Sequence, residues 1–207
     1  MLLSHPLYFA PLPFYARLFT NRELVIDGNA PFVKQTYRNR TLIATENGTQ
    51  SLTIPVVHDG GRTAMRDVRI SEHGNWRRQH WNAIVSAYRK SPFFDYYADD
   101  FAHFYEEKGG FLMDFNIRLH NMASELLGLQ HTLIIADEKN DFFSDMVEDI
   151  RYISSLARVA EDDCSKMVPY YQVFMQRHGF IPNLGIIDLL FNMGPESILV
   201  LNESRQE

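Results

Sequence analysis

The sequence predicts an α+β fold: a small N-terminal mixed or antiparallel sheet with a hairpin, followed by a mainly helical C-terminal half. Three observations predict it. Short β-branched runs separated by turn residues fill the first third of the chain. Apolar residues recur at helical spacing from about residue 75 onward. Hydrophobic residues make up 45% of the 207 residues, so the chain can form the core of one domain spanning residues 1–207.

The first elements are short strands with turns between them. Residues 1–9 are predicted to be a strand that enters a proline-rich loop, and residues 14–19 a short helix after Pro13, because proline suits the first helical turn. Residues 23–27 are strand-like and end at a Gly-Asn turn. A further strand is predicted at 63–70.

A hairpin is the clearest local signal. Two β-branched runs, 41–45 and 51–57, flank residues 46–50, which contain Asn47-Gly48. An Asn-Gly pair tolerates the positive φ that tight hairpin turns require. Pro55 has no N–H to donate, so the second strand is predicted to be bulged or at an edge there.

From residue 75 onward the spacing becomes helical. Trp76, His80, Ile84 and Tyr88 recur every four residues and therefore share one face of a helix. Further helices are predicted at 93–107, 111–127, 169–177 and 184–192, with a final apolar turn at 198–201. A short buried strand is expected at 131–136, and polar loops at 137–141 and 159–166.

Charge and cysteine content narrow the functional class. The chain has 26 acidic and 20 basic residues, which argues against a nonspecific nucleic-acid binder. Cys164 is the only cysteine, so an intrachain disulfide is excluded and a cytoplasmic location is favoured. Because no apolar run approaches the roughly 18 residues of a membrane helix, we predict no membrane insertion.

A short basic segment stands out in this acidic chain. Residues 33–42 contain Lys34, Arg38 and Arg40, with Asn39 between the arginines. In an extended strand Arg38 and Arg40 face the same side, and guanidinium groups bind phosphate or carboxylate in a bidentate way. The segment therefore predicts a site for a small anionic substrate. The alternative is that these are exposed strand residues paired with surface acids.

The helical stripe supplies the catalytic candidates. His80 is the candidate acid/base, because an imidazole titrates near pH 6.5, with Tyr88 beside it. Trp76 is a candidate for packing against the substrate. The alternative is that the stripe belongs to the core and that a backbone carbonyl satisfies His80.

Asp188 is a charge within the apolar segment IIDLLFN. A buried carboxylate needs a partner, and Arg38 or Arg40 is the predicted one, which groups Asp188 with the substrate-binding residues. The histidines lack metal-ligand spacing, so no metal site is predicted. No phosphate-loop motif is present, and the sequence assigns no cofactor. The aromatic run at 93–105 is predicted to be core and, in part, a homodimer surface.

Several stretches resemble the WbqC-like protein family. They occur in the family's order and span nearly the whole chain: KQTYRNR (34–40), SLTIPV (51–56), RDVRIS (66–71), NWRRQHWNAIVSAYRKSPFFDYY (75–97), PYYQVF (169–174) and NLGIIDLLFNMGPES (183–197). The family tends to place acidic and amide residues before its basic segment, whereas Gly-Asn-Ala-Pro occupies 28–31 here. The resemblance therefore supports a functional role for the basic segment more strongly than it supports one for any acidic residue.

The resemblance implies a function in broad terms. Family members are cytoplasmic bacterial proteins, often associated with gene clusters for surface polysaccharide (O-antigen). This implies a transferase or modifying enzyme that acts on an anionic sugar, a sugar nucleotide or an amino sugar. The alternative is a noncatalytic binding or scaffold protein that recruits biosynthetic enzymes.

Overall fold

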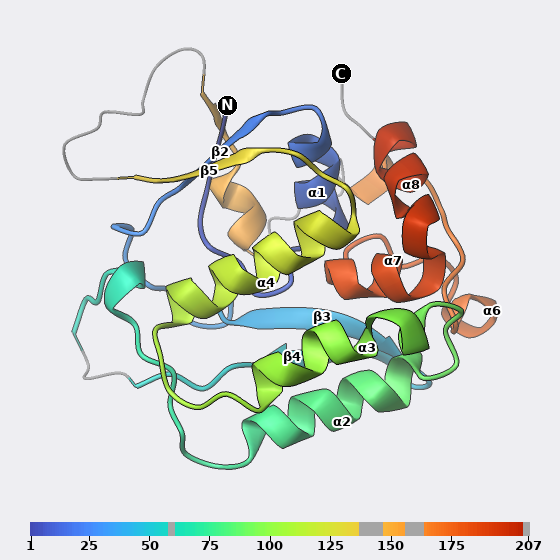
Figure 1. Cartoon of the computed structure of the whole chain (residues 1–207), viewed down its shortest axis with the longest axis horizontal. Coiled ribbons are helices and arrows are strands. Elements are labelled where there is room, and N and C mark those ends of the chain that lie inside the picture. Colours follow the sequence, from blue (N-terminus) through green and yellow to red (C-terminus); the bar gives the residue numbers. More distant parts are fainter. Residues whose placement is uncertain (58–60, 137–146, 156–163, 205–207) are drawn as a thin grey trace.

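The structure is a computed structural model that describes residues 1–57, 61–136, 147–155 and 164–204 (Figure 1). It contains a four-stranded parallel sheet and a separate antiparallel hairpin, and most of the second half of the chain is helical. The prediction of an α+β fold with an N-terminal hairpin and a helical C-terminal half is confirmed. In the described residues, no helix is both long and apolar enough to cross a membrane.

The parallel sheet has the strand order β5-β2-β1-β6. Its strands are β1 (Leu2–Ser4), β2 (Glu23–Ile26), β5 (Thr132–Ile135) and β6 (Glu148–Asp149). The apolar residues of β1 and β2 are buried, as is typical of parallel sheets. The prediction that the strand at 131–136 is buried is wrong, because β5 lies at the sheet edge and its residues are half-buried or exposed.

The predicted hairpin forms β3 (Arg40–Thr45) and β4 (Gly48–Thr53). Its turn is shorter than predicted, because only Glu46 and Asn47 separate the strands. The positive φ falls on Gly48, at 109°. The second strand ends before Pro55, so no ladder hydrogen bond is lost there.

Two predicted elements are wrong. Residues 63–70 are no strand: a 3-10 turn at Met65–Asp67 lies between isolated bridges, because its N–H groups bond to the loop at residues 28–30. Residues 169–177 contain only the short helix α6 (Met175–His178), because Tyr170 and Gln172 instead turn inward to bond Asp188. The loop predicted at 137–141 and most of that at 159–166 lie outside the described residues.

The remaining helices follow the apolar spacing. A single-turn 3-10 helix, His103–Tyr105, extends α3 along the predicted range, and Gly128 (φ 69°) follows the end of α4 as a stop. The helices are α1 (Leu12–Phe19), α2 (Trp76–Tyr88), α3 (Phe94–Ala102), α4 (Leu112–Leu126), α7 (Ile186–Met193) and α8 (Ser197–Glu203).

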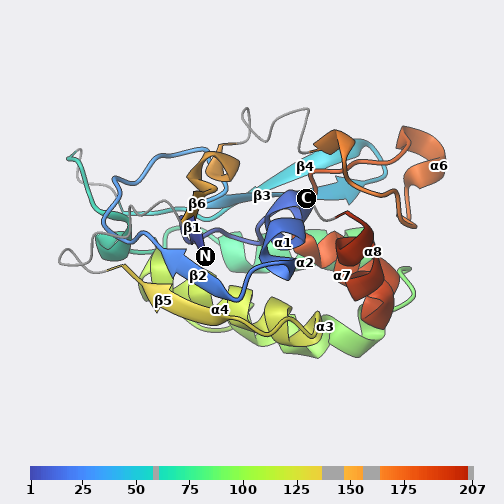
Figure 2. The same ribbon diagram turned by 90° about the horizontal axis from the view of Figure 1, so that it is seen from above.

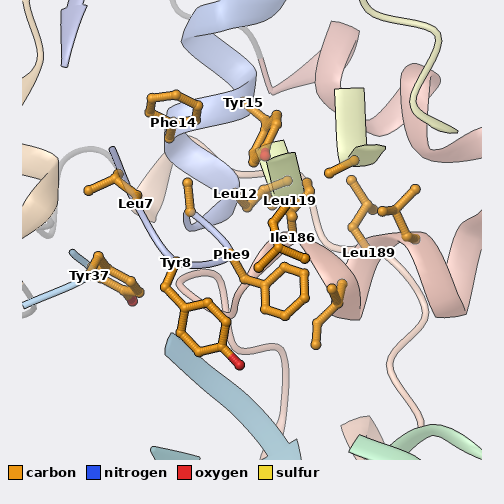
Figure 3. Close-up of a cluster of buried hydrophobic side chains, with 14 of the residues drawn as sticks. Leu7, Tyr8, Phe9, Leu12, Phe14, Tyr15, Tyr37, Leu119, Ile186 and Leu189 are labelled. Atoms are coloured by element: carbon orange, nitrogen blue, oxygen red, sulfur yellow. The ribbon is translucent and has the colours of Figure 1, made fainter. Parts of the chain in front are cut away.

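Helix α7 forms the centre of the core. It contacts α1, α2, α3, α4 and α8, and its residues from Ile186 to Asn192 are all buried. A helix that is apolar on every side is stable only when surrounded. Figure 3 shows Ile186 and Leu189 of α7 packed near Phe9. In Figure 2 the α7–α8 pair and the parallel sheet lie on either side of α1.

Candidate functional site

A cavity of about 660 Å³ lies at the carboxyl edge of the parallel sheet. His5, directly after β1, and Asp149, the last residue of β6, both line it. In the order β5-β2-β1-β6, the strands β2 and β5 are added on one side of β1 and β6 is added on the other. The cavity therefore lies beside β1 and β6, where the direction of strand addition changes. Ligands of open parallel sheets bind at this position. The lining also includes Thr36, Arg38, Arg151, Tyr152, Ser154 and Ser155.

Arg151 holds the ends of two strands together at this edge. Its Nη1 donates to Asp27 Oδ2 at 2.8 Å, and its Nη2 donates to Asp149 Oδ2 at 2.7 Å. Asp27 follows β2, so the guanidinium bridges β2 and β6 across the end of β1. The hydrogen bond from Arg151 lowers the pKa of Asp149. This ion-pair network fixes the orientation of the charges at the cavity.

Arg38 is the second cation of the cavity. Only 7% of the residue is exposed, and its Nη1 donates to the carbonyl oxygen of Pro31 at 2.7 Å. Its buried Nε has no hydrogen-bond partner in the described part of the chain. Among the described residues, no carboxylate lies within ion-pair distance of it. Burial lowers the pKa of Arg38. A buried cation with an unused N–H favours an anion beside it.

His5 is buried next to these cations. The residue is 6% exposed, and its Nδ1 has no hydrogen-bond partner within residues 1–57, 61–136, 147–155 and 164–204. Burial, and then the positive charge of Arg38, lower the pKa of His5 to about 4. The imidazole is therefore neutral at physiological pH and has a free nitrogen.

The structure separates the predicted basic residues. The prediction that Arg38 and Arg40 share a strand face is wrong, because β3 begins at Arg40 and Arg38 lies in the preceding turn. Arg38 lines the cavity, whereas Arg40 Nε donates to Thr53 Oγ1 of the hairpin at 2.9 Å. Asn39 is buried and bonds the carbonyl of Ile54, and Lys34 is exposed.

The catalytic candidates lie in the core, away from this cavity. His80 Nδ1 is 3.0 Å from the hydroxyl of Tyr8, which also bonds Tyr105 at 2.7 Å. The ring packs against Trp76, and burial lowers its pKa to about 4. The Tyr88 hydroxyl accepts a hydrogen bond from the Ala44 N–H and so ties α2 to β3. Arg38 lines the cavity, whereas His80 and Tyr88 do not.

Asp188 is also buried in the core, and its predicted pairing with Arg38 or Arg40 is wrong. Its Oδ2 accepts hydrogen bonds from the Tyr170 hydroxyl at 2.6 Å and from Gln172 Nε2 at 3.0 Å. Burial raises the pKa of Asp188 to about 6, while the Tyr170 hydrogen bond acts in the opposite direction. Neutral donors therefore stabilise this carboxylate without a cation.

We expect Tyr170→Phe to lower the free energy of unfolding by about 1.5–3 kcal/mol, because it removes a hydrogen bond to a charged group. The loss should grow above pH 6, where Asp188 is ionised and needs that donor most. Urea unfolding at several pH values measures both effects. Tyr171→Phe is the matched control, since Tyr171 is 53% exposed. A Tyr170→Phe loss that does not depend on pH would contradict this role.

Sequence reasoning missed most of the cavity. His5 and Asp27 each come directly after a short apolar strand. This position at the end of a strand was the only feature of the sequence that could have identified them. Asp149 and Arg151 gave none, because β6 is only two residues long. Within the described part of the chain, no three His, Cys, Asp or Glu side chains are grouped so that they could hold a metal ion.

Comparisons with known proteins point to one family. The model of the WbqC-like protein family matches residues 5–151. The matched segment starts at His5 and ends at Arg151, so it contains the charged residues of the cavity. A protein of Mycobacterium tuberculosis (strain ATCC 25618 / H37Rv), named "Uncharacterized protein Rv1507c", is 29% identical over 206 residues, which cover 89% of each chain. No solved structure matches the chain significantly.

Proposed function

This chain belongs to the WbqC-like protein family, and from that premise we propose that it is an enzyme of bacterial surface-polysaccharide metabolism. It acts as a transferase or modifying enzyme on an anionic sugar or a sugar nucleotide, which binds in the cavity at the carboxyl edge of the parallel sheet. The polysaccharide context rests on the family resemblance. The binding site rests on the residues of the cavity.

One observation carries the proposal: the cavity contains a buried guanidinium that has no carboxylate partner in the part of the chain that the structure describes. Arg38 is nearly inaccessible to water, yet no described residue bonds its Nε. Leaving a buried charged donor unpaired costs free energy, and a phosphate or carboxylate of a ligand would remove that cost. Arg151 lies in the same lining, already oriented by Asp27 and Asp149.

The size and lining of the cavity suit a sugar nucleotide. Its volume, about 660 Å³, lies within the usual range for small-molecule sites. Tyr152, Ser154 and Ser155, which follow Arg151 closely in the sequence, also line the cavity. Their hydroxyl groups can donate hydrogen bonds to the oxygen atoms of a sugar and accept them from its hydroxyl groups.

We expect Arg38→Met to weaken anion binding by about 1–3 kcal/mol, because a charge-assisted hydrogen bond is lost. Calorimetric titration with uridine diphosphate, inorganic phosphate and glucuronate measures the change. Arg40→Met is the matched control: it removes a guanidinium from the same segment but outside the cavity, and should leave the affinities unchanged.

Two results would contradict the proposal. One is a wild-type protein that binds none of the three probes, which would leave the scaffold alternative. The other is an equal loss in Arg38→Met and Arg40→Met. Because Arg38 also bonds the backbone of Pro31, thermal unfolding of both variants must first show that each is folded.

A further inference from the structure

His5 is the residue of the cavity lining that can change its charge by taking up one proton near neutral pH. Its Nδ1 is buried and has no hydrogen-bond partner among the residues that the structure describes, and the residue lines the same cavity as Arg38 and Arg151. A neutral imidazole presents a lone pair at such a nitrogen, and an imidazolium presents a donor. The charge that this residue contributes to the cavity therefore depends on one proton.

We propose that the anion bound in this cavity is doubly charged, and that its binding transfers one proton from solvent to His5. The inference rests on the proposed function, since it concerns the same site. It adds the ionisation state of the substrate: a terminal phosphate or phosphate monoester is favoured over a carboxylate. No bond of the ligand breaks in this step, and the proton adds to the unpartnered Nδ1.

Four charged residues from three segments act on His5. Arg38, before β3, and Arg151, after β6, disfavour the imidazolium. Asp27, after β2, favours it, and Asp149 at the end of β6 also interacts with the ring. The two cations and two carboxylates cancel in formal charge, so burial decides the balance and keeps His5 neutral in the empty cavity.

A bound dianion reverses this balance. Two negative charges next to Arg38 and Arg151 turn a local sum of zero into minus two, and a nearby opposite charge favours the charged form of a titratable group. Protonation of His5 returns the sum to minus one. A carboxylate brings one charge and so half of this effect. Phosphate monoesters carry the second charge near neutral pH, since that ionisation occurs near pH 6.

Sulfate is the probe that separates this effect from titration of the ligand, because it carries two charges throughout the pH range used. The imidazole resonances of the full-length protein are followed by NMR from about pH 8 to pH 5, and loss of one signal in His5→Gln assigns the ring. Without sulfate, His5 should remain neutral over this range. With saturating sulfate, the pKa of His5 should rise by about one unit or more, so that about half of the rings carry the proton at pH 5.

Two controls sharpen the result. Methyl sulfate has the same tetrahedral group with one charge, and should raise the pKa of His5 by about half as much, which leaves about three quarters of the rings neutral at pH 5. The exposed ring of His73 lies outside the cavity, and its resonances at a fixed pH should not shift when either ion is added. An equal effect of sulfate and methyl sulfate on His5 would overturn the preference for a dianion.

The outcomes also separate this inference from the proposed function. If sulfate shifts the backbone resonances of Thr36 and Arg38 but leaves the His5 titration unchanged, an anion binds and the proton linkage is wrong. If sulfate shifts no resonance of the cavity, both the linkage and the anion site are wrong. Arg38→Met should abolish the effect of sulfate on His5 while the ring stays visible.

Discussion

Acid should unfold this protein as the pH falls from about 6.5 towards 4, because three buried imidazoles must then take up protons. Burial lowers the pKa of His5 and of His80 to about 4, and that of His120 to about 3, from an ordinary 6.5. These shifts correspond to roughly 3–5 kcal/mol each. Their sum, on the order of 10 kcal/mol, is comparable to the total stability of a typical domain.

The sign of this effect follows from proton counts. Between pH 6.5 and 4 the three histidines are protonated in the unfolded state and neutral in the folded state. The free energy of unfolding therefore decreases as the pH is lowered. Asp188 acts oppositely, because its pKa is raised to about 6 and the folded state binds its proton first. The net difference near pH 5 is about two protons, which gives a slope of about 2.7 kcal/mol per pH unit.

His80→Gln tests the assignment. Urea unfolding, followed by the fluorescence of Trp76 and Trp81, gives the free energy of unfolding at each pH. Removing one of the buried imidazoles should halve the slope near pH 5, to about 1.4 kcal/mol per pH unit, whatever the variant does to stability at neutral pH. His73→Gln is the control, since His73 is exposed. A His80→Gln slope equal to that of the wild type would show that His80 is not buried as a neutral ring.

Phe191→Ala should lower the free energy of unfolding by about 3–5 kcal/mol, the usual loss when a fully buried aromatic ring is removed. Phe191 has no exposed surface. Its ring centre lies 5.1 Å from that of Phe94, 5.4 Å from Tyr88 and 5.8 Å from Phe101. The variant therefore leaves a cavity where α2, α3 and α7 meet, and these helices cannot all move inward to fill it.

Leu199→Ala is the control for this variant. Leu199 lies on the neighbouring helix α8 and is 57% exposed, so its replacement should change the free energy of unfolding by less than about 0.5 kcal/mol. Equal losses in the two variants, measured by urea unfolding at neutral pH, would contradict the placement of α7 at the centre of the core.

The helices and the hairpin were predictable because their signals are local. The four-residue spacing from Trp76 to Tyr88 defines one face of α2, and that face is buried. The β-branched runs around Asn47-Gly48 form β3 and β4. In both cases the residues that form the pattern are also the residues that form the element, so no distant contact was needed to identify it.

The candidate site was only partly predictable. The basic segment led to Arg38, which lines the cavity. The same reasoning grouped Arg38 with Arg40 and with His80, and the structure places these two elsewhere. The sequence pattern of a histidine among apolar residues is the same when the ring faces a pocket and when it faces the core, so the pattern does not distinguish the two cases. Which of the two applies depends on whether Tyr8, from the far end of the chain, covers it.

The sequence by itself determined the α+β class, the hairpin, the main helices and the presence of a basic segment in an acidic chain. Only the tertiary structure decided that β1 and β6 are neighbours, and hence that His5, Arg38, Asp149 and Arg151 line one cavity. The physical reason is that strands pair through backbone N–H and C=O groups, which nearly every residue carries. Strand pairing therefore leaves little trace in the sequence, and this site is built by strand pairing.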